Sequence, residues 1–502
     1  MPTNSYDLIV LGDDLGALVC ATLCARRGLR TLLLGEDRPA RYTLGPHKLP
    51  IEPAIWPAPG ASTGDRVLKE LHAELALRRK SREPKIAAQL VAPDLRVDLG
   101  VDRLGQELER ELGKAGGEAW LARWEASTAI ARQLDPMLGT EHAFPPVGFF
   151  ERRELAKLAE RAHAEATAWW NDAKADPHAA LWRHLAAVAH RHPEPSAIAI
   201  ARAVDAWRAG PVSLRGEGDT IRELFLEKLA TAGGEARAGR ITEISVSWGK
   251  VTSITLASGD ELGCAQVVAS KPPGELVELL GKKAPKRMSE LAEGVALVGH
   301  RYTLNVVIDQ AGVPEHMAPT VALIADPSAE PFGANAFSIH LGDPDDTGRV
   351  IATIATLLAA DSSDDRDRLV ARCGTLRAAL WKRLDEVMPF FERHLVLAHS
   401  PFEAAPPQVP GGGGSYDVPK HLPLAMTRVW AGRAESLLDG TAHTAALTYT
   451  TGLKNLTLTG EQVLPALGVE GALVAGWSAA KVACAIAGKK KDYLQNEVVG
   501  AA

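Results

Sequence analysis

Small residues and one acid occupy the turn between an apolar run and a helix-forming segment near the N-terminus. Residues 6–11 have the composition of a buried parallel strand, residues 15–27 carry apolar side chains at helical spacing, and residues 31–34 form a second apolar run. A strand, a tight turn, a helix and a second strand within about 30 residues are typical of a dinucleotide-binding unit. The turn residues are therefore the first candidates for contact with phosphate.

The dinucleotide fingerprint G-x-G-x-x-G is degenerate in this turn. Gly12 fills its first position, and Ala17 fills the third, where a small side chain still allows the helix to pack on the strand. Asp14 stands at the second glycine position and adds bulk and negative charge beside a phosphate, with Leu15 and Gly16 completing the turn. Two alternatives stay open for this motif: a dinucleotide site with altered contacts, or a Rossmann-like turn without a nucleotide.

The acid that binds the ribose hydroxyls of a dinucleotide normally ends the second strand. Counting from Gly12, Gly35 occupies that position, and Glu36 follows one residue later. Because the ends of elements slip by a residue or two, we take Glu36 as the candidate for the ribose contact.

A second glycine-rich segment lies near the C-terminus, between an expected strand at residues 456–458 and an expected helix that includes residues 478–482. Many glycines between a strand and a helix indicate that the backbone closely approaches another group. The candidate residues in this segment are Gly460, Glu461, Pro465, Gly468 and Gly471.

These five residues carry a family resemblance. Their order, Gly-acid-x3-Pro-x2-Gly-x2-Gly after a strand, resembles the second flavin-contacting motif of the phytoene desaturase and amine oxidase family of FAD enzymes. The resemblance implies that Glu461 holds the ribityl or pyrophosphate region of FAD and that the later glycines line the flavin ring. The hairpin and returning strand at residues 240–270 are similar to the family's re-entry into the Rossmann sheet. Residues 326–340 and 365–399 resemble its phytoene desaturase branch.

The resemblance implies an α/β fold that is discontinuous in sequence. A Rossmann-like FAD/NAD(P)-binding domain would gather residues 1–75, 205–295 and 440–502, and a mixed α+β substrate domain with a helical cap would gather residues 76–204 and 296–439. The cap is expected within the first of these two segments, which is rich in the helix formers Ala, Leu, Glu and Arg.

The function implied is that of an FAD-dependent oxidoreductase similar to phytoene desaturases. Such an enzyme oxidises a hydrophobic, in this family isoprenoid, substrate by hydride transfer to the flavin, so no catalytic side chain is predicted. Three departures favour an alternative: Asp14, Gly35 and the absence of paired glycines at residues 38–41. The alternative is a flavin-free binding or chaperone-like protein on the same fold, of the kind that Rab GDP-dissociation inhibitors represent.

Composition excludes several other classes of protein. The chain has 502 residues, 56 basic and 62 acidic side chains and a net charge of −6, which argues against a nucleic-acid partner. Five scattered cysteines and the poor spacing of His184, His190 and His192 argue against a metal site. No oligomeric state is predicted.

A cytoplasmic location is expected, because the cysteines are few and the N-terminus lacks the pattern of a signal peptide. No run of about 18 apolar residues suggests a membrane-spanning helix. The basic residues 489–491 leave two alternatives open: a solvated terminus, or peripheral contact with the inner face of an anionic membrane.

Overall fold

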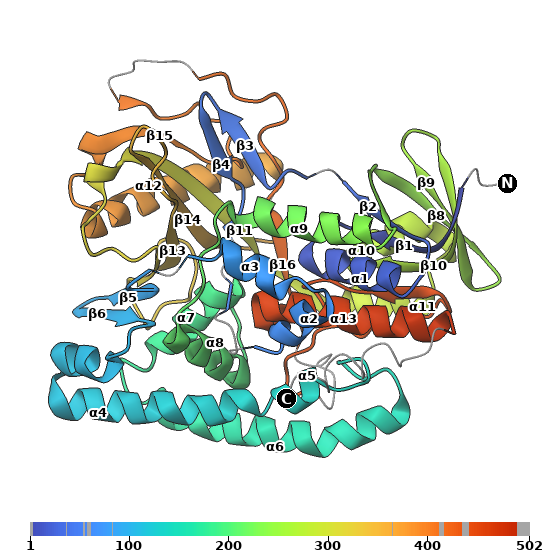
Figure 1. The fold of residues 1–502 in the computed structure, drawn as a ribbon, viewed down its shortest axis with the longest axis horizontal. Coiled ribbons are helices and arrows are strands. Elements are labelled where there is room, and N and C mark those ends of the chain that lie inside the picture. The colour runs from blue at the N-terminus through green and yellow to red at the C-terminus, as the bar shows by residue number, and fades with distance from the viewer. Residues whose placement is uncertain are drawn as a thin grey trace.

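The described residues form two large sheets that lie side by side, a separate two-stranded hairpin, and helices on the outside (Figure 1). The α/β architecture predicted from the sequence is confirmed. This computed structural model describes residues 4–36, 38–53, 56–57, 62–82, 84–363, 365–410, 416–433 and 441–488. The basic residues 489–491 lie outside the described residues.

The first sheet places the two predicted glycine-rich turns at one edge. Its central strands pair in parallel, so the turns that follow β1, β2, β10 and β17 meet at the same carboxyl edge. Strand β7 pairs in parallel with β2, and β9 and β8 add an antiparallel hairpin beyond β10. In sheet order the strands are β7 (Glu235–Ala238), β2 (Thr31–Gly35), β1 (Asn4–Leu11), β10 (Glu261–Ala269), β9 (Lys250–Leu256) and β8 (Ile241–Ser247), with β17 (Leu456–Leu458) also on β10.

The second sheet is built around one long strand, β11 (Val295–Asp309), which pairs with β14, β15 and β16. The hairpin of β3 (Arg41–Leu44) and β4 (His47–Pro50) packs on the core of this sheet. In the chain, however, the hairpin directly follows β2 of the first sheet. The remaining strands are β15 (Leu395–His399), β14 (Arg349–Ala359), β13 (Ala336–Leu341), β12 (Thr320–Ile324), β5 (Ala88–Ala92), β6 (Leu95–Leu99) and β16 (Thr427–Gly432).

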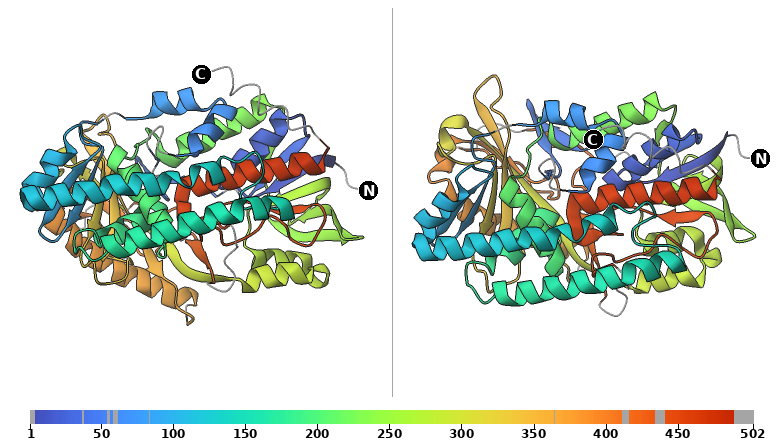
Figure 2. Two further views of the ribbon diagram at one scale, coloured as in Figure 1. Left: turned by 90° about the horizontal axis from the view of Figure 1, so that it is seen from below. Right: turned by 60° about the horizontal axis from the view of Figure 1, so that its bottom comes forward.

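Helices cover both sheets and form the predicted cap. Two long helices of the cap, α4 and α6, run next to one another along one side of the molecule (Figure 2). The cap consists of α4 (Leu104–Arg132), α5 (Asp135–Leu138), α6 (Phe149–Ala173), α7 (Leu181–His190) and α8 (Ala197–Ala209). The other helices are α1 (Leu15–Arg26), α2 (Gly64–Glu70), α3 (Glu74–Lys80), α9 (Glu217–Thr231), α10 (Pro273–Leu280), α11 (Lys286–Glu293), α12 (Arg366–Val387) and α13 (Gly468–Ile486).

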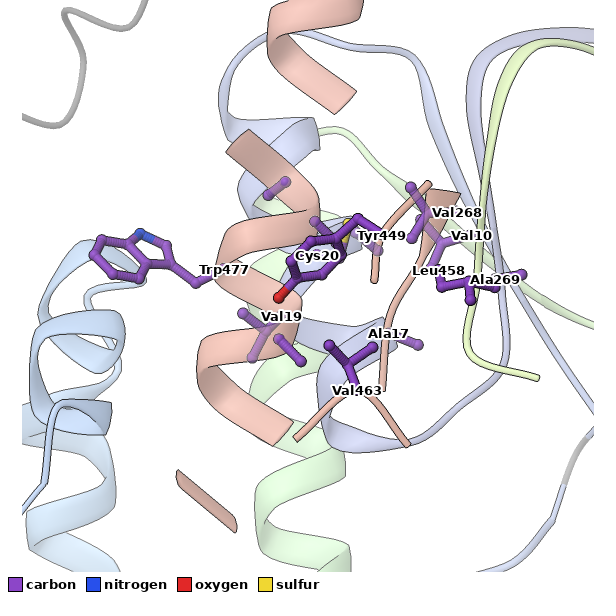
Figure 3. Packing of buried hydrophobic residues seen from close by; sticks show 14 of the residues in the cluster. Val10, Ala17, Val19, Cys20, Val268, Ala269, Tyr449, Leu458, Val463 and Trp477 are labelled. Carbon is purple, nitrogen blue, oxygen red and sulfur yellow. The ribbon is translucent and has the colours of Figure 1, made fainter. Parts of the chain in front are cut away.

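Helices α1 and α13 pack against each other through glycines. A Cβ atom on Gly476 would clash with the carbonyl oxygen of Gly16, and a Cβ atom on Gly16 would lie 2.7 Å from the Cα of Gly460. Around this crossing, Ala17 and Cys20 lie in the apolar core beside α13 (Figure 3). The two glycine-rich segments therefore meet in the fold, which fixes the start of α1 against the turn before α13.

Replacing Gly476 by alanine is expected to lower the free energy of unfolding by about 1–3 kcal/mol, because the added methyl group overpacks the α1–α13 contact. Urea unfolding measures this change. Gly374→Ala is the matched control, since Gly374 also lies inside a helix but has nothing within 4 Å of an added Cβ. The control should leave stability unchanged or raise it; equal losses in both variants would contradict the packing argument.

The expectation that no helix is apolar enough to cross a membrane is wrong on composition. The helical residues Pro465–Ile486 are long and apolar enough to cross a membrane, yet 72% of their apolar stretch is buried inside the fold. Trp477 at its centre is completely buried. This helix is therefore explained as the core helix of the first sheet.

Candidate functional site

A cleft of about 560 Å³ lies between the two sheets, at the carboxyl edge of the first. Its size falls in the range of small-molecule sites, and such edges commonly bind ligands in α/β folds. Six of the eleven predicted site residues line it, namely Asp14, Leu15, Glu36, Glu461, Pro465 and Gly468. The structure thus brings the two predicted motifs to one cleft, while Gly12, Gly16, Ala17, Gly460 and Gly471 are not among its lining residues.

Asp14 is the N-cap of α1 and points its carboxylate at the start of that helix. The backbone N–H of Ala17 donates to Asp14 Oδ1 at 2.8 Å, and the Ser270 hydroxyl donates to Oδ2. Backbone N–H groups at such a position are the ones that bind phosphate in dinucleotide sites. In this protein an internal carboxylate already accepts one of them.

The surroundings of Asp14 favour its neutral form. Burial, helped by the nearby Glu461 and Asp13 carboxylates, raises the pKa of Asp14 to about 6 despite the lowering effect of its two hydrogen bonds. The start of α1 therefore has a negative potential when Asp14 is ionised, and this potential weakens when Asp14 takes up a proton.

The other two predicted acids are held in ion pairs. Glu36 Oε1 lies 2.5 Å from Lys271 Nζ, just beyond the end of β10. Glu461 Oε2 lies 2.6 Å from Arg301 Nη2, in the middle of β11. Both carboxylates therefore need to exchange or share these partners before they can bind the hydroxyls of a ligand.

The C-terminal glycines approach other parts of the protein. A Cβ atom on Gly460 would lie 2.5 Å from Asp14 Oδ2, and one on Gly471 would clash with the carbonyl oxygen of Leu464. The inference from the sequence that the backbone approaches something closely is correct at these two positions. The approaching groups, however, are internal, so these two glycines do not by themselves require a ligand.

A partly buried carboxylate, Glu52, pairs with three arginines at the wall of the cleft. Glu52 lies 3.4 Å from Arg38, 3.1 Å from Arg191 and 3.6 Å from Arg301, measured from carboxylate oxygen to guanidinium nitrogen. Burial opposes its ionisation, yet the three guanidinium groups together lower the pKa of Glu52 to about 2. With Glu461 included, three arginines face two carboxylates, so this cluster is locally positive, although the cleft lining as a whole has six acidic side chains and five arginines.

Sequence reasoning missed this arginine cluster. Glu52 follows β4, Arg191 follows α7 and Arg301 lies on β11, so no spacing in the chain relates them. Arg191 also has a positive φ of 54°, which is uncommon for a residue with a side chain, because it ends α7 as a left-handed C-cap. Nothing in the amino-acid order signals this backbone conformation.

The described part of the chain contains no group of three or more His, Cys, Asp or Glu side chains that could hold a metal ion. His190 Nε2 lies 3.1 Å from the carbonyl oxygen of Ala199, inside the packed cap. All five cysteines are free, and four of them are buried.

Comparison with known proteins supports this architecture at the level of fold. No protein-family model and no curated protein matches the sequence. Among solved structures, a putrescine oxidase variant with redesigned cofactor binding is similar to this chain with a TM-score of 0.60 and 14% identity, over 97% of this chain and 100% of that one. The chain has the fold of the FAD-dependent amine oxidases.

Two further structures share this amine oxidase fold. An oxidoreductase from Methanosarcina mazei matches with a TM-score of 0.56 and 12% identity, over 94% of this chain and 99% of that one. A Rab GDI from Plasmodium falciparum matches with a TM-score of 0.51 and 9% identity, over 95% and 97% of the two chains. At such identities the likeness establishes the amine oxidase fold, and function has to be argued from the cleft itself.

The amine oxidase fold implies FAD, and the fit of the cleft to FAD depends on Asp14. An ionised Asp14 would face the two phosphates with like charge, whereas a neutral carboxyl group can donate a hydrogen bond to a phosphate oxygen. Elsewhere the cleft offers apolar walls at Leu15 and Val469, beside the starts of α1 and α13. The residues therefore fit the dinucleotide when Asp14 is protonated.

Proposed function

We propose that this chain is an FAD-dependent oxidoreductase that binds its cofactor in the cleft between the two sheets. The observation that carries the proposal is the convergence of six predicted cofactor positions, from residue 14 to residue 468, on that single cleft. The amine oxidase fold supports the proposal, because it supplies the architecture in which such a cleft holds a flavin.

Each part of the dinucleotide has a candidate partner in this chain. The start of α1 with a neutral Asp14 would hold the pyrophosphate, and Glu36 would hold the ribose after releasing Lys271. Pro465, Gly468 and their neighbours at the start of α13 would lie beside the flavin ring. When bound, FAD would accept a hydride from the substrate, and the protein would contribute position, electrostatics and exclusion of water.

The predicted substrate is a hydrophobic small molecule. The charged side chains of the cleft indicate that this molecule also carries a polar group. Apolar side chains such as Ile51, Trp56 and Met426 line the same cleft as the Glu52 arginine cluster. A substrate with an apolar body and an anionic or strongly polar end fits both kinds of wall better than a pure hydrocarbon. The isoprenoid class rests on the resemblance in sequence alone.

A second candidate function is a flavin-free binding protein on the same fold. The observation that favours it is the Asp14 carboxylate, which caps α1 where a phosphate would bind. The similarity in fold to a Rab GDI is compatible with this alternative.

The visible absorption spectrum of the purified protein, before and after addition of FAD at about pH 6, separates the two candidates. The proposal predicts a bound flavin spectrum and release of FAD on denaturation. Val469→Trp, which fills the cleft beside α13, should abolish uptake while leaving the circular dichroism spectrum unchanged. A colourless protein that takes up no FAD would favour the flavin-free function.

A further inference from the structure

The hairpin of β8 and β9 ends in an exposed tryptophan. Trp248 and Gly249 form a two-residue turn between the paired residues Ser247 and Lys250. The side chain of Trp248 is 96% exposed, and both turn residues have positive φ angles, 51° and 70°. This backbone conformation belongs to the turns that favour Asn-Gly, so a bulky aromatic residue is disfavoured at the first position.

Trp248 is therefore unfavourable for the folded chain in two independent ways. Its backbone lies in the left-handed region, and its large ring gains almost no burial. Residues kept in such conformations at exposed positions are often functional. A contact outside the chain explains both features.

Basic side chains surround this turn. The Lys283 ammonium donates to the carbonyl oxygen of Val246 at 2.8 Å, and the backbone N–H of Lys454 donates to the carbonyl oxygen of Gly249 at 3.1 Å. A Cβ atom on Gly452 would lie 3.1 Å from the Cβ of Arg287. Three segments thus converge on one surface, here called the hairpin surface, whose exposed cations are Lys250, Lys282, Lys283, Lys286, Arg287 and Lys454.

The charge of the hairpin surface contrasts with that of the whole chain. Residues 246–250, 281–287 and 452–454 contain no Asp or Glu, whereas the chain carries a net charge of −6. Glu290 offsets part of the charge, lying 3.5 Å from both Lys286 and Arg287. Figure 1 shows the hairpin projecting from one end of the molecule, beyond α10 and α11, so an extended flat surface can reach it.

We propose that the hairpin surface docks on an anionic phospholipid membrane. The ring of Trp248 would enter the headgroup region, where amphipathic aromatic side chains are favoured, and the surrounding cations would face the lipid phosphates. The combination of one projecting aromatic ring with lysines from three segments suits a lipid surface. This proposal does not depend on the binding of FAD.

Co-sedimentation of the full chain with lipid vesicles tests the proposal. The protein should bind vesicles of phosphatidylcholine mixed with phosphatidylglycerol, bind pure phosphatidylcholine weakly, and lose binding as salt is raised. Lys282→Glu combined with Lys454→Glu should weaken binding at least about tenfold. Arg366→Glu combined with Lys382→Glu makes the same charge change on exposed positions of α12, at the other end of the molecule, and should have little effect.

Trp248→Asn separates docking from folding. Asparagine suits the turn better than tryptophan, so the melting temperature should stay the same or rise while vesicle binding falls several-fold. The proposal is wrong if the parent protein binds neither kind of vesicle, or if Trp248→Asn and the double charge variant bind as the parent does. Binding to nucleic acid or to an acidic protein without vesicle binding would assign the surface to that partner instead.

Discussion

Replacing Asp14 by asparagine is expected to strengthen FAD binding about 100-fold at pH 8. The parent protein must protonate Asp14 before the phosphates of FAD can approach the start of α1, and burial raises the pKa of Asp14 only to about 6. Each pH unit above the pKa therefore costs about a factor of ten in affinity. Asparagine caps a helix as well as aspartate and carries no charge, so this requirement disappears.

The sign of the pH dependence follows from the same shift. Because the pKa of Asp14 is raised in the folded protein, the neutral form dominates below about pH 6 and is lost as the pH rises. The FAD affinity of the parent should be constant below pH 6 and fall above it, whereas the affinity of Asp14→Asn should stay flat across that range. Titration of flavin fluorescence at several pH values measures both curves.

Asp13→Asn is the matched control, because Asp13 also lines the cleft but pairs with Arg222 at 3.3 Å. It removes one negative charge and should keep the fall of affinity with pH, with the midpoint moved to lower pH because Asp13 contributes to the raised pKa of Asp14. A parallel fall of affinity in Asp14→Asn and the parent would contradict the role given to this carboxyl group. Absence of FAD binding in every variant at every pH would favour the flavin-free function.

Glu470→Ala is expected to lower the free energy of unfolding by about 3 kcal/mol, the lower end of the cost of breaking a buried ion pair, because Arg202 keeps Asp135 as a second partner at 2.7 Å. Arg202 on α8 donates to both carboxylate oxygens of Glu470 on α13, at 2.8 and 2.7 Å, and both side chains are almost completely buried. Glu470 also accepts from the backbone N–H of Thr63 at 2.6 Å. This pair therefore fixes the helical cap to the core helix of the first sheet.

Guanidinium-induced unfolding measures this loss, and a double variant tests its cause. Arg202→Met combined with Glu470→Leu removes both charges and retains apolar volume, so it should be much less destabilised than Glu470→Ala. A loss below about 1 kcal/mol in Glu470→Ala, or equal losses in the single and double variants, would show that the ion pair is not what holds the cap.

The first sheet was predictable because its strands are marked by local patterns. The sequence predicts a strand at residues 456–458, where three residues precede a glycine-rich segment, and β17 has those bounds. The pattern of apolar runs and turns also placed β1, α1 and β2 within one or two residues. These strands and this helix depend on residues that are close together in the chain, and the spacing of apolar residues reveals such local structure.

The contents of the cleft were less predictable, because their partners are distant in sequence. Asp14 meets Ser270, and Glu461 meets Arg301, across 256 and 160 residues. Glycine spacing correctly indicated a close approach at Gly460 but could not say that the approaching group is Asp14. The β3–β4 hairpin likewise packs on the core of the second sheet through Tyr42, Leu44 and Leu49, and these contacts depend on residues that are distant in the chain.

The length of β11 has a mechanical consequence for ligand entry. The strand runs through 15 residues, about 50 Å, and pairs with neighbouring strands along most of its course, with register shifts near both ends and Arg301 of the cleft near its middle. A strand paired with neighbours on both sides resists bending, so Arg301 is expected to keep its place relative to the second sheet when a ligand enters. The part of the cleft wall that Arg301 forms is then a rigid surface, to which a ligand has to adapt its own conformation.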